Sequence, residues 1–180
     1  MQKSISVLFL LLVLFSCGSD GGMDPNLEKP FFDLRAYMTE EIERLEGYPL
    51  TVEKSITLNG TTETQKLTDL NYANDLRVFR EADINRNAWI DKYTTEVDDL
   101  SGSHKVTTYQ AQDSSLQTQR LVVEEDQGVV TRVGIRRKTG TVLSDGEHWL
   151  EYLPARGYSV KTKQANRFGN DVDALIEVSW

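Results

Sequence analysis

The sequence reads Val172-Asp173-Ala174-Leu175-Ile176-Glu177-Val178-Ser179-Trp180 over its last nine positions. Successive side chains of a β-strand point to opposite faces of a sheet. Every second position of this stretch therefore faces the same way, and these positions are all apolar: Val172, Ala174, Ile176, Val178 and Trp180. The pattern predicts a strand with one buried face, so we expect this end of the chain to be an ordered part of a sheet.

Six further segments upstream have the composition of strands. They are separated by short breaks rich in Gly, Ser, Asp, Asn and Thr, at intervals of about 8–12 residues. Connections this short imply that neighbouring strands run antiparallel. The candidate strands are residues 92–97, 105–112, 116–125, 129–138, 147–152 and 158–164.

A β-hairpin is predicted around Asn59-Gly60. Both residues tolerate the positive φ angles that a two-residue hairpin turn requires. Residues 50–58 alternate, with Lys54 as the one interruption on the apolar face, and residues 61–67 are rich in threonine. Asn59-Gly60-Thr61 also matches a glycosylation sequon, but a two-residue turn explains the tripeptide without modification.

Two helical segments are also predicted. Residues 30–46 have Pro30 placed for the first turn and Gly47 placed to close the end. The apolar face of this segment consists of Phe31, Leu34, Met38, Ile42 and Leu45. A second helix is expected from Thr68, as N-cap, to about residue 81. Together the elements predict an α+β fold: one or two N-terminal helices packed on a curved, mainly antiparallel, half-barrel-like sheet of about seven to nine strands.

The N-terminus has the organisation of an export signal. Lys3 is followed by an apolar run over residues 5–15 that only Ser6 interrupts. This length suits the hydrophobic region of a signal peptide, about 7–15 residues, and is too short for a spanning helix of about 20. The run leads into Leu14-Phe15-Ser16-Cys17, and Cys17 is the only cysteine in the chain.

This tetrapeptide resembles the lipobox of bacterial lipoproteins. Leu14 matches the third position before the cysteine, Ser16 the small residue before the cleavage point, and Cys17 the lipid-bearing residue. The resemblance implies a signal peptide at residues 1–16, a lipid-modified Cys17 at the start of a tether over residues 17–29, and membrane attachment through the acyl chains. The alternative is an ordinary secretory signal in which the cysteine is incidental.

Two further resemblances concern location. Gly18 stands where many proteobacterial lipoproteins retained in the inner membrane have aspartate, and Ser19-Asp20 faintly resembles the acidic export signals of Bacteroidota surface lipoproteins. The order of elements is also similar to that of small Bacteroidota envelope lipoproteins, a resemblance that carries no catalytic motif. These features imply the cell envelope, with the outer membrane as the expected site and its periplasmic or surface face left open.

Composition limits the partners of the remaining chain. Removal of residues 1–16 leaves 164 residues (180 − 16), and the region 30–180 suits one domain. Loss of Lys3 moves the formal net charge from −8 to −9. Such an acidic domain argues against binding of nucleic acid.

No coherent catalytic or metal-binding constellation is recognised. The stretch Asp83-Ile84-Asn85-Arg86-Asn87 resembles the start of a calcium loop, but Ala88 replaces the required glycine and Thr94 the required glutamate. We interpret it as a polar turn in which Asp83 or Asn85 caps a short helix. No catalytic, cofactor or metal residue is therefore predicted, and the protein is expected not to be an enzyme.

The two histidines and one short basic run are interpreted as surface residues. His104 and His148 are interpreted as surface residues, because no cysteine accompanies them and no nucleophile elbow or phosphate loop is present. Arg136-Arg137-Lys138 is interpreted as a solvated strand end, with contact to an anion or a partner as the alternative.

Aromatic residues offer the one candidate ligand face. In a sheet they usually belong to the core, but a partly covered, curved sheet could use them to line an apolar groove. The candidate residues are Trp89, Tyr93, Trp149, Tyr152 and Tyr158. The leading hypothesis is a lipid-anchored, non-enzymatic envelope protein that binds a protein partner or an apolar ligand through its sheet. The alternatives are a periplasmic lipid or lipoprotein carrier-like accessory and a hydrolase of envelope polymers.

Overall fold

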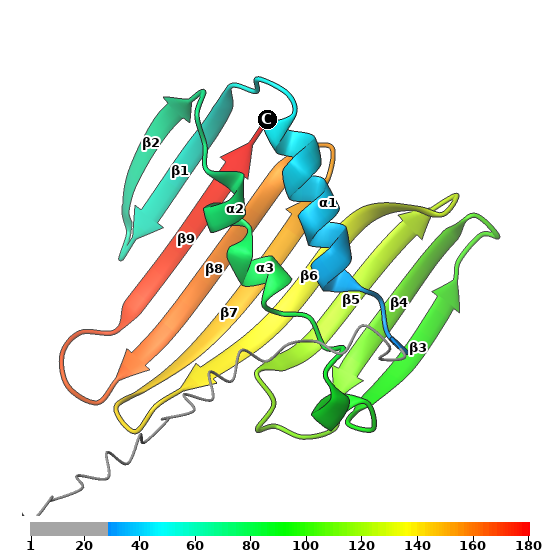
Figure 1. Ribbon diagram of the computed structural model, residues 1–180. Helices are drawn as coiled ribbons and strands as arrows, with labels where there is room; N and C mark the ends of the chain where they lie inside the picture. The colour runs from blue at the N-terminus through cyan, green and yellow to red at the C-terminus, as the bar shows by residue number, and fades with distance from the viewer. Residues whose placement is uncertain (1–28) are drawn as a thin grey trace, which may run out of the picture.

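The computed structural model describes residues 29–180, which form a single nine-stranded antiparallel sheet with short helices (Figure 1). The strands are β1 Val52–Leu58, β2 Thr61–Leu67, β3 Tyr93–Asp99, β4 His104–Ala111, β5 Thr118–Asp126, β6 Val129–Gly140, β7 Ser144–Leu153, β8 Gly157–Asn166 and β9 Val172–Ser179. Their order across the sheet is β2-β1-β9-β8-β7-β6-β5-β4-β3. The predicted antiparallel, sheet-dominated fold is confirmed, whereas Cys17 and the signal region lie outside the described residues.

β9 joins the two parts of the sheet. It pairs with β1 on one side and with β8 on the other, so that Val178 lies beside Lys54 and Tyr158. The predicted alternation is confirmed most clearly near its end, where Val178 is buried and Glu177 is exposed. The other predicted strands are confirmed too, with ends displaced by at most three residues.

The predicted hairpin is confirmed, and its turn explains its register. Asn59 has φ 48° and Gly60 has φ 87°, as a type I′ turn requires. Leu58 consequently faces Thr61 across the turn. The Asn59 side chain accepts a hydrogen bond from the Asp173 backbone N–H over 2.9 Å, which ties the turn to the start of β9.

The helices differ from the prediction in their bounds. Helix α1 spans Leu34–Glu46 and begins four residues late, because the Asp33 side chain caps it by accepting a hydrogen bond from the Ala36 N–H over 3.2 Å. The predicted second helix is replaced by two short ones, α2 Tyr72–Asp75 and α3 Arg77–Arg80, followed by the 3₁₀ helix η1 Asn87–Trp89.

The expected N-cap of the second helix is also corrected. Asn71, and not Thr68, caps α2, because its side chain accepts a hydrogen bond from the Asn74 N–H over 2.9 Å. The helix begins only after the chain has left β2 at Leu67 and crossed a bend.

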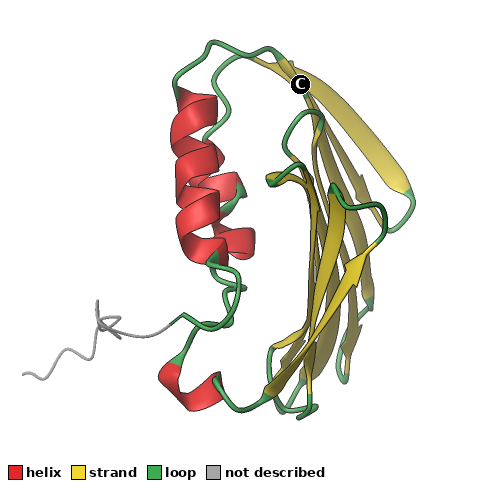
Figure 2. Cartoon of the chain, turned by 90° about the vertical axis from the view of Figure 1, so that its right-hand side faces the viewer, coloured by secondary structure: helices red, strands yellow, loops and turns green. Residues whose placement is uncertain are grey.

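The helices lie beside one face of the sheet (Figure 2). The apolar residues of α1 belong to the same buried cluster as strand residues such as Val133 and Leu150. The Tyr37 ring meets the Tyr152 ring at 6.4 Å, and the Tyr152 hydroxyl donates a hydrogen bond to Glu41 Oε2 over 2.6 Å. Arg44 also donates to this carboxylate over 2.7 Å, so Glu41 links α1 to β7.

Aromatic rings fill much of the space between the helices and the strands. Phe79 of α3 packs edge-on against Tyr152 and Tyr158, with ring centroids 6.0 Å away in both cases. Trp180 packs against the same two tyrosines at 6.2 and 6.3 Å. Such pairs contribute about 0.5–1.5 kcal/mol each beyond burial of their area.

A partly buried polar contact explains the interruption in the first strand. Lys54 and the Tyr158 hydroxyl both donate to Asp75 Oδ2. The lysine that breaks the apolar pattern of β1 is therefore paired with a carboxylate of α2. This contact ties the N-terminal hairpin, α2 and β8 together.

Replacing Tyr152 by phenylalanine tests the link between α1 and the sheet. The variant keeps the buried ring but removes the hydroxyl that donates to Glu41, a hydrogen bond to a charged group worth about 1.5–3 kcal/mol. We expect urea denaturation to show a free energy of unfolding lower by about 1–2 kcal/mol, because Arg44 still pairs with Glu41. Tyr48→Phe is the control, since Tyr48 is 66% exposed and should be neutral. Equal stability of the two variants would contradict the proposed link.

Candidate functional site

The five aromatic residues predicted to line an apolar face do not share one face. Tyr93, Tyr152 and Tyr158 are between 0 and 6% exposed and belong to the core. Their hydroxyls are engaged as well, and that of Tyr93 donates to the Thr118 carbonyl over 2.6 Å. Burial raises the pKa of Tyr152 and Tyr158 above the ordinary tyrosine range.

The two tryptophans of this set lie elsewhere. Trp89 in η1 packs beside Tyr93, and the Arg86 guanidinium lies 4.3 Å from its ring centroid. Trp149 lies between Leu150, which faces the core, and His148, so alternation in β7 directs it to the opposite face. Alternation within the predicted strand 147–152 already places Trp149 and Tyr152 on opposite faces, a signal that could have separated them in the sequence.

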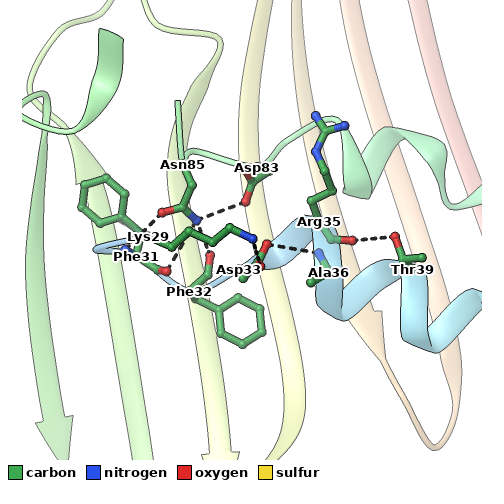
Figure 3. Close-up of polar contacts among 9 residues, drawn as sticks. All are labelled: Lys29, Phe31, Phe32, Asp33, Arg35, Ala36, Thr39, Asp83 and Asn85. Carbon is green, nitrogen blue, oxygen red and sulfur yellow. Dashed lines mark hydrogen bonds and ion pairs between the residues drawn. The ribbon is translucent and has the colours of Figure 1, made fainter. Parts of the chain in front are cut away.

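The stretch that resembles a calcium loop has a structural role (Figure 3). Asn85 Oδ1 accepts a hydrogen bond from the Phe31 N–H over 3.2 Å, and Asn85 Nδ2 donates to the Phe32 carbonyl over 3.0 Å and to Asp83 Oδ1 over 3.3 Å. Neither side chain caps η1, which corrects the predicted role. Within residues 29–180 no group of three or more His, Cys, Asp or Glu side chains is placed to hold a metal ion.

The basic run of β6 is divided between the two faces. Arg137 is 8% exposed on the helix side, where it donates to the Val78 carbonyl over 3.2 Å, so the solvated interpretation is wrong for this residue. Burial lowers its pKa. Arg136 and Lys138 lie on the other face, 3.1 and 3.9 Å from Glu147.

The two histidines do not come together. His148 is partly buried on β7, and its ring nitrogens hydrogen-bond the hydroxyls of Thr139 and Thr162 over 2.9 and 3.0 Å. Burial, followed by the nearby Arg137, lowers the pKa of His148. His104 begins β4, on the far side of β5 and β6, so no shared site is formed.

The face of the sheet opposite the helices, called here the open face, carries a groove of about 950 Å³. It extends across the ends of β6, β7, β8 and β9 and reaches the loop before β5. Strand pairing places its charged and aromatic side chains on this open face. They are Lys138, Asp145, Glu147, Trp149, Lys163 and Asp173.

Trp149 is the one aromatic side chain among the described residues that line this groove. Trp149 is on β7. It lies directly across from Arg136 of β6 on one side and from Lys161 of β8 on the other. Its ring is half-buried, so one part packs on the sheet and another is available to a partner. An aromatic ring surrounded by polar groups can stack on an apolar surface while the polar groups fix orientation.

The groove is mixed in polarity and slightly acidic. It is lined by four carboxylates and two lysines, and the amides of Asn59 and Gln164 add donors and acceptors. Lys163 lies 4.0 Å from Asp173, and Glu147 is paired with Arg136 and Lys138. The excess of carboxylates over lysines suits a neutral partner better than an anionic one. A second hollow of about 450 Å³ lies on the same face beside β1 and β9.

Comparison with protein-family models, with curated proteins and with solved structures found no significant match for this chain. Among residues 29–180, no helix has the length and apolar character needed to cross a membrane.

Asp83 provides a test of the buried polar cluster. It is 2% exposed, and burial raises its pKa above the ordinary value of 3.8. A carboxyl whose folded-state pKa is raised favours folding most below its unfolded pKa, and this contribution is lost as the pH rises through the folded pKa. Asp83→Asn removes the charge and keeps an acceptor for Asn85. We expect a gain in unfolding free energy on the order of 1 kcal/mol at pH 7.

This gain should shrink as the pH falls through the raised pKa of Asp83 in the folded protein, because the wild-type carboxyl then becomes protonated and neutral. Urea denaturation of both proteins at several pH values measures it. Asn87→Asp, at an exposed position of the same segment, is a charge control and should show little change. A difference between Asp83→Asn and wild type that is constant with pH would show that the carboxyl charge is not the cause.

Proposed function

We propose that this protein is a lipid-anchored, non-enzymatic protein of the cell envelope that binds a neutral glycan in the groove around Trp149. The observation that carries the binding proposal is the position of Trp149, which lies half-buried in the groove of about 950 Å³ on the open face. The lipobox-like residues Leu14 to Cys17 support the anchor.

A glycan fits the chemistry of the groove. The C–H face of a sugar ring is apolar and packs on an aromatic ring, whereas its hydroxyls need donors and acceptors at the rim. Trp149 supplies the ring, and carboxylates such as Asp145 and Asp173 supply the polar partners. The excess of carboxylates over lysines disfavours anionic polymers. We further propose that the sheet is curved like a half-barrel, which its side view supports (Figure 2).

The alternatives have less support. An apolar-ligand or lipid carrier would need an apolar cavity, but the tyrosines available for it are packed in the core. A hydrolase of envelope polymers is the second candidate, because Asp145, Glu147, Asp171 and Asp173 all line the same groove. Two carboxylates are the usual catalytic groups of glycoside hydrolysis, so turnover is monitored in the binding experiment below.

Cys17→Ala tests the anchor. The full-length chain is expressed in a bacterial host with radiolabelled or alkyne-labelled fatty acid. We expect the wild-type protein to incorporate label and to be processed before Cys17, whereas the variant should remain an unlabelled precursor, because the chain has no other cysteine. Ser16→Ala, which keeps a small residue before the cleavage point, is the control and should be labelled normally. Labelled Cys17→Ala protein would contradict the anchor.

Trp149→Ala tests the groove. Calorimetric titration of the purified full-length protein with neutral oligosaccharides, such as chito- and gluco-oligosaccharides, should reveal binding that the variant weakens at least about tenfold, or 1.4 kcal/mol. Leu175→Ala is the matched control, since Leu175 lies in the same cross-strand row of the open face but outside the groove. The glycan proposal fails if no oligosaccharide binds or if both variants bind like wild type. Shortened oligosaccharides detected by mass spectrometry would favour the hydrolase.

A further inference from the structure

Two neighbouring hairpin connections expose large apolar side chains at one end of the sheet. Val142 and Leu143 in the β6–β7 connection are 79 and 57% exposed, and Phe168 in the β8–β9 connection is 82% exposed. The connections are adjacent, because the Arg167 N–H donates to the Leu143 carbonyl over 2.9 Å. Val142, Leu143 and Phe168 are called the apolar tips.

The backbone of these connections is well satisfied internally. Thr141 Oγ1 accepts hydrogen bonds from the N–H groups of Leu143 and Ser144, both over 3.1 Å. In the second connection Asn166 Nδ2 donates to the Asn170 carbonyl over 2.7 Å. Apolar side chains thus project from turns that already pair many of their polar backbone groups, which lowers the cost of entering a less polar medium.

The chain enters the described domain at the same end of the sheet. Phe31 packs on Tyr93, which begins β3, and on Tyr109 near the end of β4. Because the strands alternate in direction, the start of β3 and the ends of β4, β6 and β8 share one end. This is the lower end in Figure 1.

The distance from the proposed anchor permits contact with the same bilayer. Eleven residues, 18–28, separate Cys17 from Lys29, and a chain of this length spans at most about 36–40 Å. β4 and β6 are two strand spacings apart, about 10 Å. A lipid at Cys17 would therefore hold the apolar tips within reach of the membrane surface.

We propose that the apolar tips enter the headgroup region of a zwitterionic phospholipid bilayer and orient the domain on it. The inference rests on the proposed lipid anchor. Apart from Arg167, the outermost residues of both tips are uncharged, and Asp145 and Asp171 lie just behind them, which disfavours an anionic lipid surface. A stable protein interface needs about 20–30 residues a side, more than two turns offer, whereas shallow insertion needs only a few apolar side chains.

This orientation also places the groove. Gly140, Asp145 and Asp171 line the groove and flank the two tips, so the groove opens immediately above the headgroups. A glycan bound there would be one presented at the membrane surface.

The test uses full-length, lipidated protein with a cysteine introduced at one of two positions. Lipidation blocks the Cys17 thiol, so Phe168→Cys or Val129→Cys can be labelled selectively with an environment-sensitive nitrobenzoxadiazole dye. Val129 is the matched control, because it is a 66%-exposed apolar residue that begins β6, next to the turn at the opposite end of the sheet. Proteins are reconstituted on phosphatidylcholine–phosphatidylethanolamine vesicles with and without brominated lipid.

We expect the dye at position 168 to shift its emission to the blue and to be quenched by brominated lipid at least threefold more than the dye at position 129. Equal, water-like emission and equal quenching at the two positions would overturn the proposal. A blue shift at position 168 that needs no vesicles and grows with protein concentration would also overturn it, in favour of a second copy covering the tips.

Mass spectrometry and vesicle flotation of each sample separate this proposal from the anchor. An acylated, vesicle-bound protein with a water-exposed position 168 overturns the insertion of the tips and leaves the anchor intact. A protein that carries no acyl groups and does not bind the vesicles overturns both the anchor and the insertion of the tips. An acylated protein whose label at position 168 is quenched supports both.

Discussion

The pairing of β9 with β1 is the contact on which the rest of the sheet depends. Glu53 lies opposite Ser179, 126 positions away in sequence (179 − 53), so this register closes a long loop at a large entropic cost. Without it the β1–β2 hairpin would be an isolated two-stranded ribbon, which is marginal in water. The same register brings Lys54 beside Tyr158 and Asp75, so the packing of α2 depends on it as well.

Alternation along the strands places the side chains that stabilise the fold on one face of the sheet and those of the proposed binding groove on the other. In β7 the even-numbered residues Leu150 and Tyr152 face the core, and the odd-numbered Glu147 and Trp149 face the groove. The helix side is dominated by rings and buried polar pairs, and the open face by ion pairs such as Arg132 with Glu124 and Glu151. A shift of one residue in a single strand would exchange these roles, which is why register matters more here than composition.

The strands were predictable because their signals are local. Alternation in residues 172–180 and the Asn59-Gly60 turn each require only neighbouring residues, and both predictions are confirmed. Asn85, by contrast, depends on Phe31, 54 positions away, so a sequence pattern could not show that it fastens the start of the described chain. Trp149 was one of five candidate groove residues in the sequence, but its charged companions in the groove could not be predicted, since Lys138 of β6 and Lys163 of β8 join it only through strand pairing.

The two borders of the sheet have a consequence for self-association. β2 and β3 each have one neighbour only, and a strand in that position presents unpaired N–H and carbonyl groups that could template another chain. β3 carries Glu96, Asp98 and Asp99, all exposed. A copy that docked through the same border would bring matching carboxylates face to face. Electrostatic repulsion therefore opposes pairing of two copies through their β3 strands.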